Sequence, residues 1–391
     1  MVLANAAIHR CHAGERRYAY EVICLERLSR QLKAYVIFYL GEYSTPKTVM
    51  SALFGAAGVA AVSSLTKGQE AMCVHVLALC CRYQNQLDLA REHEEDAWNR
   101  AKLTGSIMVT MPIGVNVIRL CHIFGNLRRA KEVESKLFLM MLKEKVFGVF
   151  GRKLMIPKEN VADGAGFVAA LLALSHVYRN PRRTKMIHYL LQAGIKQCRD
   201  AGEKFDVLVP TFGRPWHALV LIELGELDRC EVAMESGEWG TDMLRYQQTA
   251  TFELLTAKFH LAKALTLRGS QRDDHINQGL RAANVAIEKV SAANYTWWLT
   301  LATLTKGQIL AVVDRKDDAD EALSSARTMS EQGPFHLLHV DTLLAQAQTA
   351  YARGNLPASR DLAQAALAES NEWEYGLRHA ALKGILKKTK S

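Results

Sequence analysis

The chain has 391 residues, of which 49% are hydrophobic and 23% charged, and it carries a formal net charge of +9. This composition is typical of a folded globular protein and excludes a disordered or collagen-like chain. The length allows two or three domains or one long repeat array. A pI near 9.1 is basic, but below the level of a dedicated nucleic-acid-binding protein.

The sequence predicts no membrane segment and no disulfide framework. The most apolar stretch, residues 53–65, is too short to span a bilayer. Several charged residues precede any long apolar run at the N-terminus, which excludes a signal peptide. The eight cysteines include no CxxC pair, so we expect reduced, buried thiols in a cytoplasmic protein.

Periodic apolar residues at steps of three or four predict helices along most of the chain. Two irregular inserts, 148–166 and 202–215, interrupt them, and the best candidate for a strand is 207–209. In chain order, the predicted helices are 1–11, 18–39, 68–83, 87–103, 109–124, 127–146, 167–178, 184–201, 216–224, 227–237, 244–267, 276–292, 295–313, 318–331, a pair within 336–367, and 375–386.

Four short turns of one kind separate helices along the chain. Each has a residue that tolerates the left-handed conformation, a leucine two positions later, and a small residue three positions after the leucine. We expect each turn to end one helix, its leucine to pack beneath the corner, and its small residue to admit the next helix closely. The turns begin at Asn85, Gly125, Gly225 and Gly354.

The predicted fold class is all-α, a right-handed α-solenoid of about 7–9 degenerate helix pairs. The solenoid is expected to run through 1–391, with a possible division into 1–147 and 167–391 joined by an irregular connection at 148–166. No polar cap precedes the first helices, so we expect a further domain before residue 1 in the parent protein.

Small residues recur at the inward positions of these helix pairs, and the pattern resembles the tetratricopeptide repeat. The resemblance is tightest over 336–367, although the consensus Trp and the terminal Pro of that repeat are missing. The small residues are Ala347, Ser359 and Ala366 around the last turn, and Ala78, Ala90 and Ala97 around the first.

The chain as a whole is similar to the helical-repeat sensor region of bacterial STAND NTPases, which include MalT-like regulators. The resemblance implies a sensor that binds a protein or ligand and relieves autoinhibition of an ATPase. The chain contains no Gly-Lys dipeptide and therefore no phosphate loop, so no nucleotide-binding residue is carried over. The similar stretches are 14–20 followed by 38–42, 218–227, and 339–356.

Two short motifs fail as metal or catalytic signatures. Cys73 and Cys80 share one helix face but His75 points elsewhere, which favours buried thiols. Residues 93–96 resemble a zincin helix but alanine replaces the second histidine at position 97, which favours a solvated acidic face. We expect no metal, cofactor or catalytic residue, with a catalytic set assembled only by folding as the open alternative.

A basic segment covers residues 119–158, which hold ten Lys or Arg residues and three acidic ones. A second basic group follows at 179–185. If their faces align, they form a surface that attracts nucleic acid or an acidic protein; a solvated helix face is the alternative. The candidate partner-binding residues here are Arg128, Arg129, Lys131, Arg182 and Arg183.

Large aromatic residues begin two of the predicted helices. Trp216 with His217, and Trp297, are candidates to line the concave groove of the solenoid and anchor a partner peptide. Packing inside the array is the alternative interpretation.

These patterns together predict a non-catalytic protein-interaction or sensor module in a signalling or regulatory NTPase system. Its expected partner is a protein or peptide in the concave groove, with no membrane contact. The alternative is a nucleic-acid-binding regulator that uses the basic surface at 119–185.

Overall fold

The computed structural model describes residues 67–83, 85–143, 148–150, 153–155, 177–179, 214–235, 247–292 and 295–389, and all statements below concern these residues. The predicted helices within 1–39, most of the predicted pair at 167–201, and the strand candidate at 207–209 lie outside them. The elements are α5 (Lys67–Tyr83), α6 (Leu87–Lys102), α7 (Ile107–Phe124), α8 (Leu127–Lys143), β1 (Gly148–Phe150), β2 (Lys153–Met155), α12 (Arg214–Leu224), α13 (Leu227–Glu235), α14 (Gln247–Thr266), α15 (Gly269–Ala292), α16 (Thr296–Val312), α17 (Lys316–Gln332), α18 (His336–Ala352), α19 (Leu356–Glu372), the 3-10 helix η4 (Gly376–Arg378) and α20 (His379–Lys388).

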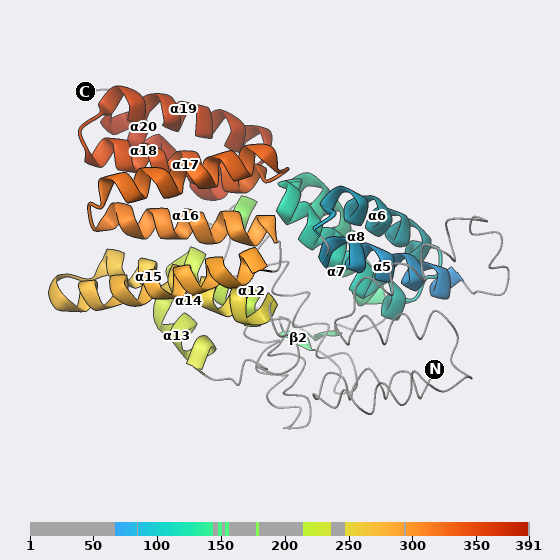
Figure 1. The fold of residues 1–391 in the computed structure, drawn as a ribbon. Helices are drawn as coiled ribbons and strands as arrows, with labels where there is room; N and C mark the ends of the chain where they lie inside the picture. The colour runs from blue at the N-terminus through green and yellow to red at the C-terminus, as the bar shows by residue number, and fades with distance from the viewer. Residues whose placement is uncertain are drawn as a thin grey trace.

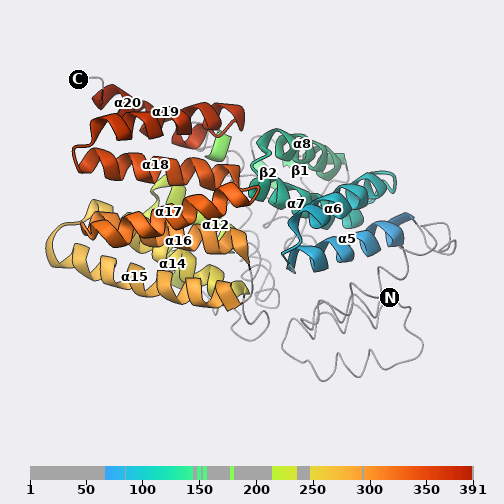
Figure 2. The same cartoon turned by 45° about the horizontal axis from the view of Figure 1, so that its top comes forward.

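The structure confirms the predicted all-α solenoid of helix pairs. Each of α5, α7, α12, α14, α16 and α18 packs most closely on the helix that follows it. The pair α5–α6 packs on the pair α7–α8, and from α12 onwards each pair packs on the next. In Figures 1 and 2, α14–α20 form a stack of such pairs. Most observed helix bounds lie within two or three residues of those predicted, because the apolar periodicity that buries one face also fixes the length of the helix.

The helices form two layers. The first helices of successive pairs touch one another, α12 with α14, α14 with α16, and α16 with α18, and α18 also touches α20. The second helices reach the next pair through its first helix, as α15 reaches α16 and α17 reaches α18. The first helices therefore make the inner layer, the closely spaced side of a curved array, and the second helices make the outer layer.

The four predicted corners adopt the expected backbone. Asn85, Gly125, Gly225 and Gly354 all have positive φ angles, between 59° and 78°. The small residues that follow are fully buried at all four corners, as predicted. The prediction for the leucines was right at the second corner, where Leu127 is 1% exposed, and wrong at the last corner, where Leu356 is 37% exposed.

A short β-hairpin lies within the stretch predicted to be an irregular connection. The strands β1 and β2 are antiparallel, with Val149 opposite Leu154. Only Gly151 and Arg152 separate them in the sequence, the length of a two-residue hairpin loop with Gly first. With three residues per strand, the run is too short to show the alternation from which strands are predicted.

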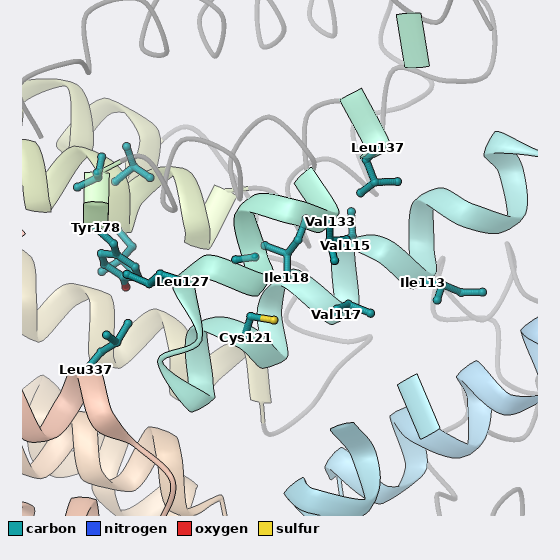
Figure 3. Packing of buried hydrophobic residues seen from close by; sticks show 14 of the residues in the cluster. Ile113, Val115, Val117, Ile118, Cys121, Leu127, Val133, Leu137, Tyr178 and Leu337 are labelled. Carbon is teal, nitrogen blue, oxygen red and sulfur yellow. The ribbon is translucent and has the colours of Figure 1, made fainter. Parts of the chain in front are cut away.

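The described helices gather into two groups in Figures 1 and 2: the N-terminal block, α5–α8, and the C-terminal array, α12–α20. The largest apolar cluster includes residues from both groups. Figure 3 shows Leu127, Tyr178 and Leu337, from three separate parts of the sequence, converging at one end of this cluster. The block and the array therefore share a core, although the predicted division of the chain at 148–166 remains a prediction.

Within the described ranges, no helix combines the length and the apolar character needed to cross a lipid bilayer.

Candidate functional site

The N-terminal block meets the C-terminal array at the first two corners, and we call this contact the junction. The Asn85 side chain accepts hydrogen bonds from the hydroxyl of Thr296, at 3.0 Å, and from its backbone N–H, at 3.4 Å. It thereby caps the start of α16 from another part of the chain. At the second corner, a Cβ on Gly125 would lie 3.0 Å from the Cβ of His336, the first residue of α18.

The two contacts have the same register. Asn85 and Gly125 are 40 residues apart in the sequence, and so are Thr296 and His336. The ends of two successive inner helices in the block, α5 and α7, therefore meet the starts of two successive inner helices in the array, α16 and α18. A repeat of one length on both sides lets both contacts form together.

A third contact continues this series. Tyr178 lies between His122 at the end of α7 and Tyr375 at the start of η4, with edge-on ring contacts at 5.5 Å on each side. The neighbouring Arg179 donates a hydrogen bond of 2.8 Å to Glu134. Burial, with a smaller contribution from Arg179, lowers the pKa of His122 to about 3, so this ring is neutral at physiological pH.

An ion network beside this contact joins three helices of the inner layer, α12, α14 and α18, to η4. Arg378 binds Asp341 in a bidentate manner at 2.6 and 3.2 Å, and its other nitrogen lies 2.9 Å from Glu223. Lys258 also donates to Glu223, at 3.1 Å. Burial alone raises the pKa of the Glu223 carboxyl, but Arg378 and Lys258 together hold it at about 2.

A small apolar cavity of about 10 Å³ adjoins Lys258 on the inner layer. Its walls come from three successive inner helices, α12, α14 and α16. It has room for about one water molecule, and an apolar cavity of this size stays dry. The lining residues are Leu219, Thr251, Leu254, Leu255, Lys258, Trp298 and Leu301.

The arginines predicted to bind a partner already have acidic partners within the chain. Arg129 binds both carboxylate oxygens of Glu95, at 2.9 and 2.6 Å, and also Glu132 at 2.9 Å. Arg128 contacts Glu374 across the junction at 3.2 Å, although its side chain is 76% exposed. Lys131 is exposed on α8. The basic segment is therefore partly neutralised, which weakens the nucleic-acid alternative.

One aromatic candidate lies in the core, and the side chains of the other candidates are outside the described part of the chain. Trp297 is 8% exposed and packs edge-on against Trp298 at 4.5 Å, which favours the packing interpretation over the groove. Trp216 and His217 lie in α12, but their side chains are outside the described part of the chain, as are Arg182 and Arg183 entirely. Partner binding by these residues stays a prediction.

The sequence analysis missed a buried polar pair in the N-terminal block. Glu94, which was predicted to lie on a solvated acidic face, is fully buried and its carboxylate lies 2.7 Å from Nδ1 of His75. That prediction was wrong for Glu94. A possible signal was its spacing, since it lies four residues after one buried alanine and three before another, Ala90 and Ala97, on the inward face of α6.

A second cavity, of about 40 Å³, opens between α6 and α8 over α7. Arg91 covers one side, with its guanidinium 4.4 Å from the centre of the Phe124 ring. Burial raises the pKa of the Cys121 thiol in its wall to about 12, so this thiol is protonated and unreactive at neutral pH. Among the described residues, no group of three or more His, Cys, Asp or Glu side chains is arranged to hold a metal ion.

Comparisons with known proteins give similarity in structure alone. No protein-family model matches the chain. No curated protein matches it. Among solved structures, the chain is similar to a Rap protein complexed with Competence and Sporulation Factor, with 11% identity and a TM-score of 0.41 over 100% of this chain and 97% of that one. It is also similar to the APC/C hetero-tetramer Cut9-Hcn1, with 11% identity and a TM-score of 0.29 over 99% of this chain and 82% of that one. Both TM-scores are low, so we take the fold from the helix packing described above.

Proposed function

We propose that the chain is a non-catalytic protein-interaction or sensor module that detects a protein or peptide through a change at the junction. The junction carries this proposal. In a simple solenoid each repeat touches only its neighbours, so binding at one repeat has no direct route to distant ones. Here contacts span more than 200 residues of sequence, as between Asn85 and Thr296 and between Arg128 and Glu374. A ligand that prefers one arrangement of block and array shifts the equilibrium between them.

The two cavities described above, both in the part of the chain that the structure describes, are small. Their volumes are about 10 and 40 Å³. Pockets that bury a small organic ligand have roughly 300–1,000 Å³. A protein or peptide instead binds across a surface, and a solenoid offers an extended one.

We extend the proposal to a cytoplasmic signalling system with a regulatory NTPase, on the basis of the resemblance to STAND sensor regions in the sequence. In that setting, opening or closing the junction is the signal passed to the NTPase. No residue of this chain is assigned to nucleotide chemistry.

The test locks the junction and measures peptide binding. The double variant Asn85→Cys and Thr296→Cys places two thiols where the side chains now form a hydrogen bond. Oxidation then joins the two thiols in a disulfide bond, which locks the junction. A random peptide library displayed on phage is selected against the reduced chain, and the enriched peptides are then measured on reduced and oxidised chains by fluorescence anisotropy. We expect at least one peptide family whose affinity changes about tenfold on locking. The unmutated chain, treated with the same oxidant, is the control.

Two results would overturn the proposal. If no peptide family is enriched, the chain is not a peptide-binding module. If enriched peptides bind the locked and unlocked chains equally, the junction is a structural contact and takes no part in sensing.

A further inference from the structure

The outer surface of the N-terminal block carries a second unusual feature, the line along which α6 and α8 lie side by side. We call this line the α6–α8 seam. Arg129 of α8 pairs with Glu95 of α6. Seven residues further along each helix, Lys136 lies close enough to Lys102 for charge repulsion to affect its proton affinity. A step of seven residues is two helical turns on the same face, so α6 and α8 run in the same direction along the seam.

The two halves of the seam differ in their charge pairing. In the first half, Arg129 lies between Glu95 and Glu132, so its charge is neutralised. In the second half, Lys102 and Lys136 hold the corresponding positions: burial lowers the pKa of Lys102, and repulsion from Lys136 and Arg129 lowers it further, against a smaller opposing effect of Glu95. No ion pair involving Lys102 or Lys136 is found within the described ranges of the chain. The second half therefore presents two positive charges with no acidic partner of its own.

Two large apolar side chains flank these lysines. Leu103, directly after α6, is 72% exposed, and Leu139, one helical turn beyond Lys136 on α8, is 64% exposed. Single exposed leucines are ordinary on protein surfaces. Leu103 directly follows Lys102, and Leu139 lies one helical turn from Lys136, so we group the four residues as one surface that combines apolar area with positive charge, the lysine–leucine patch (Lys102, Leu103, Lys136 and Leu139).

A rigid base supports this patch. Trp98 of α6 and Leu137 of α8 are fully buried beneath it, and both press on Gly114 of α7, where a Cβ would lie 2.6 Å and 2.8 Å from their atoms. The Lys102 ammonium lies 5.9 Å from the centre of the Trp98 ring. Side chains mounted on such a close-packed base lose little freedom when a partner binds.

We infer that the lysine–leucine patch is a docking surface for an acidic, amphipathic helix of a partner protein. Glutamates or aspartates of such a helix complete the ion pairs that the second half of the seam lacks. Its apolar residues, spaced three or four apart, cover Leu103 and Leu139.

This inference rests on the proposed function, because it names the chemistry of a partner for a protein-interaction module. The patch lies at the ends of α6 and α8, whereas the junction corners lie at their starts. A helix of 16 residues is about 24 Å long, so the two surfaces are separate. A partner can therefore occupy the patch without displacing the junction.

The test uses the full chain and three labelled probes. The first probe is a helical peptide of about 20 residues, roughly 30 Å long, with glutamates on either side of a row of leucines. The second has every glutamate replaced by lysine, and the third is a DNA duplex of about 20 base pairs. Fluorescence anisotropy is measured at low and at moderate salt. We expect the acidic peptide to bind, the basic peptide not to bind, and the affinity to fall as salt rises.

Two sets of variants locate the binding. Lys102→Glu with Lys136→Glu reverses both charges of the patch, and we expect it to weaken the acidic peptide at least about tenfold. Leu103→Ser with Leu139→Ser removes the apolar contact, with an expected loss of about fivefold. The matched control is Lys383→Glu with Lys387→Glu, which makes the same change in net charge at exposed sites on α20, outside the patch. We expect this control to stay within about twofold of the unmutated chain, apart from a general electrostatic effect.

Three results would overturn the inference: equal binding of the acidic peptide to the patch variant and the unmutated chain, equal loss in the patch and control variants, or DNA binding that only the patch variant abolishes. The last result assigns the surface to nucleic acid. If library-selected peptides bind the patch variants as tightly as the unmutated chain, the patch is not the binding surface, while the proposed function stands. If no library peptide binds the chain at all, the proposed function itself is wrong.

Discussion

The first two corners and the last two share one sequence pattern but have different surroundings. Asn85 and Gly125 touch the starts of α16 and α18. A Cβ at Gly225 or Gly354 would meet no atom within 4 Å among the described residues. All four have the same left-handed backbone. The same turn therefore ends a helix wherever it occurs, and becomes a contact only where another part of the chain packs against it.

This difference explains why the pattern alone did not reveal the junction. The corner forms through local contacts, because positive φ and the small residue three positions after the leucine are properties of a short stretch. The contact at Asn85 depends on Thr296, 211 residues away. Four tests compare the two kinds of corner and probe the network beside the junction.

Arg378→Ala removes the centre of the ion network beside the junction. Asp341 and Glu223 then remain largely buried, and only Lys258 is left to neutralise them. We expect the free energy of unfolding to fall by about 3 kcal/mol, as measured by urea denaturation. Arg360→Ala, at an exposed position on α19, is the control and should change it by less than about 0.5 kcal/mol. A similar small change in both variants would show that the network contributes little.

Gly125→Ala and Gly225→Ala compare a packed corner with an open one. Both place alanine at a positive φ, which costs about 1 kcal/mol in each case. Only Gly125→Ala also brings a Cβ to 3.0 Å from His336. We expect it to lower the free energy of unfolding by about 2 kcal/mol, against about 1 kcal/mol for Gly225→Ala. If thermal or urea unfolding shows equal losses of stability in the two variants, α18 moves away from the added Cβ without a further loss of stability.

Asn85→Gly keeps the left-handed corner but removes the side chain that caps α16. We expect a loss of about 1 kcal/mol and faster hydrogen exchange in the first turn of α16. Asn355→Gly is the matched control, because Asn355 caps its own helix, accepting a hydrogen bond from the N–H of Ala358. It should affect exchange in α19 and leave α16 unchanged. Unaltered exchange at Thr296 in Asn85→Gly would argue against the cap.

His339→Gln tests the pH dependence of α18, on which the second corner rests. A hydrogen bond from Nδ1 to Glu369, at 2.6 Å, raises the pKa of His339 above its ordinary value of 6.5, against the opposing effect of burial. The charged ring thus stabilises the folded chain fully below pH 6.5, and this contribution disappears as pH rises through the folded-state pKa.

The unmutated chain should therefore be more stable than His339→Gln at about pH 6, by less than about 1 kcal/mol, and this difference should shrink towards about pH 9. Unfolding by urea at a series of pH values measures it. His336 on the same helix is a useful comparison, because burial lowers its pKa and its contribution has the opposite sign. A difference that grows with pH would contradict the assignment to His339.

Much of the candidate site lay beyond prediction because its partners are remote in the sequence. Arg128 and Arg129 stood out as basic residues, but their acidic partners, Glu374 and Glu95, lie 246 and 34 positions away. The periodicity of one helix gives the face on which a side chain lies, and nothing about the charge opposite it. Trp297 was ambiguous for the same reason, since groove and core residues follow the same helical spacing.

The sequence by itself determined the all-α class, most helix bounds, the four left-handed corners and the buried small residues at each. These follow from local physics, namely apolar periodicity, the conformational freedom of Gly and Asn, and the room that a small side chain leaves. Tertiary structure alone decided that the block meets the array at two corners, that Glu94 is buried against His75, and that Arg378 joins Asp341 and Glu223. Each of these pairs joins separate helices, and the distances between them exist only once the repeats have stacked.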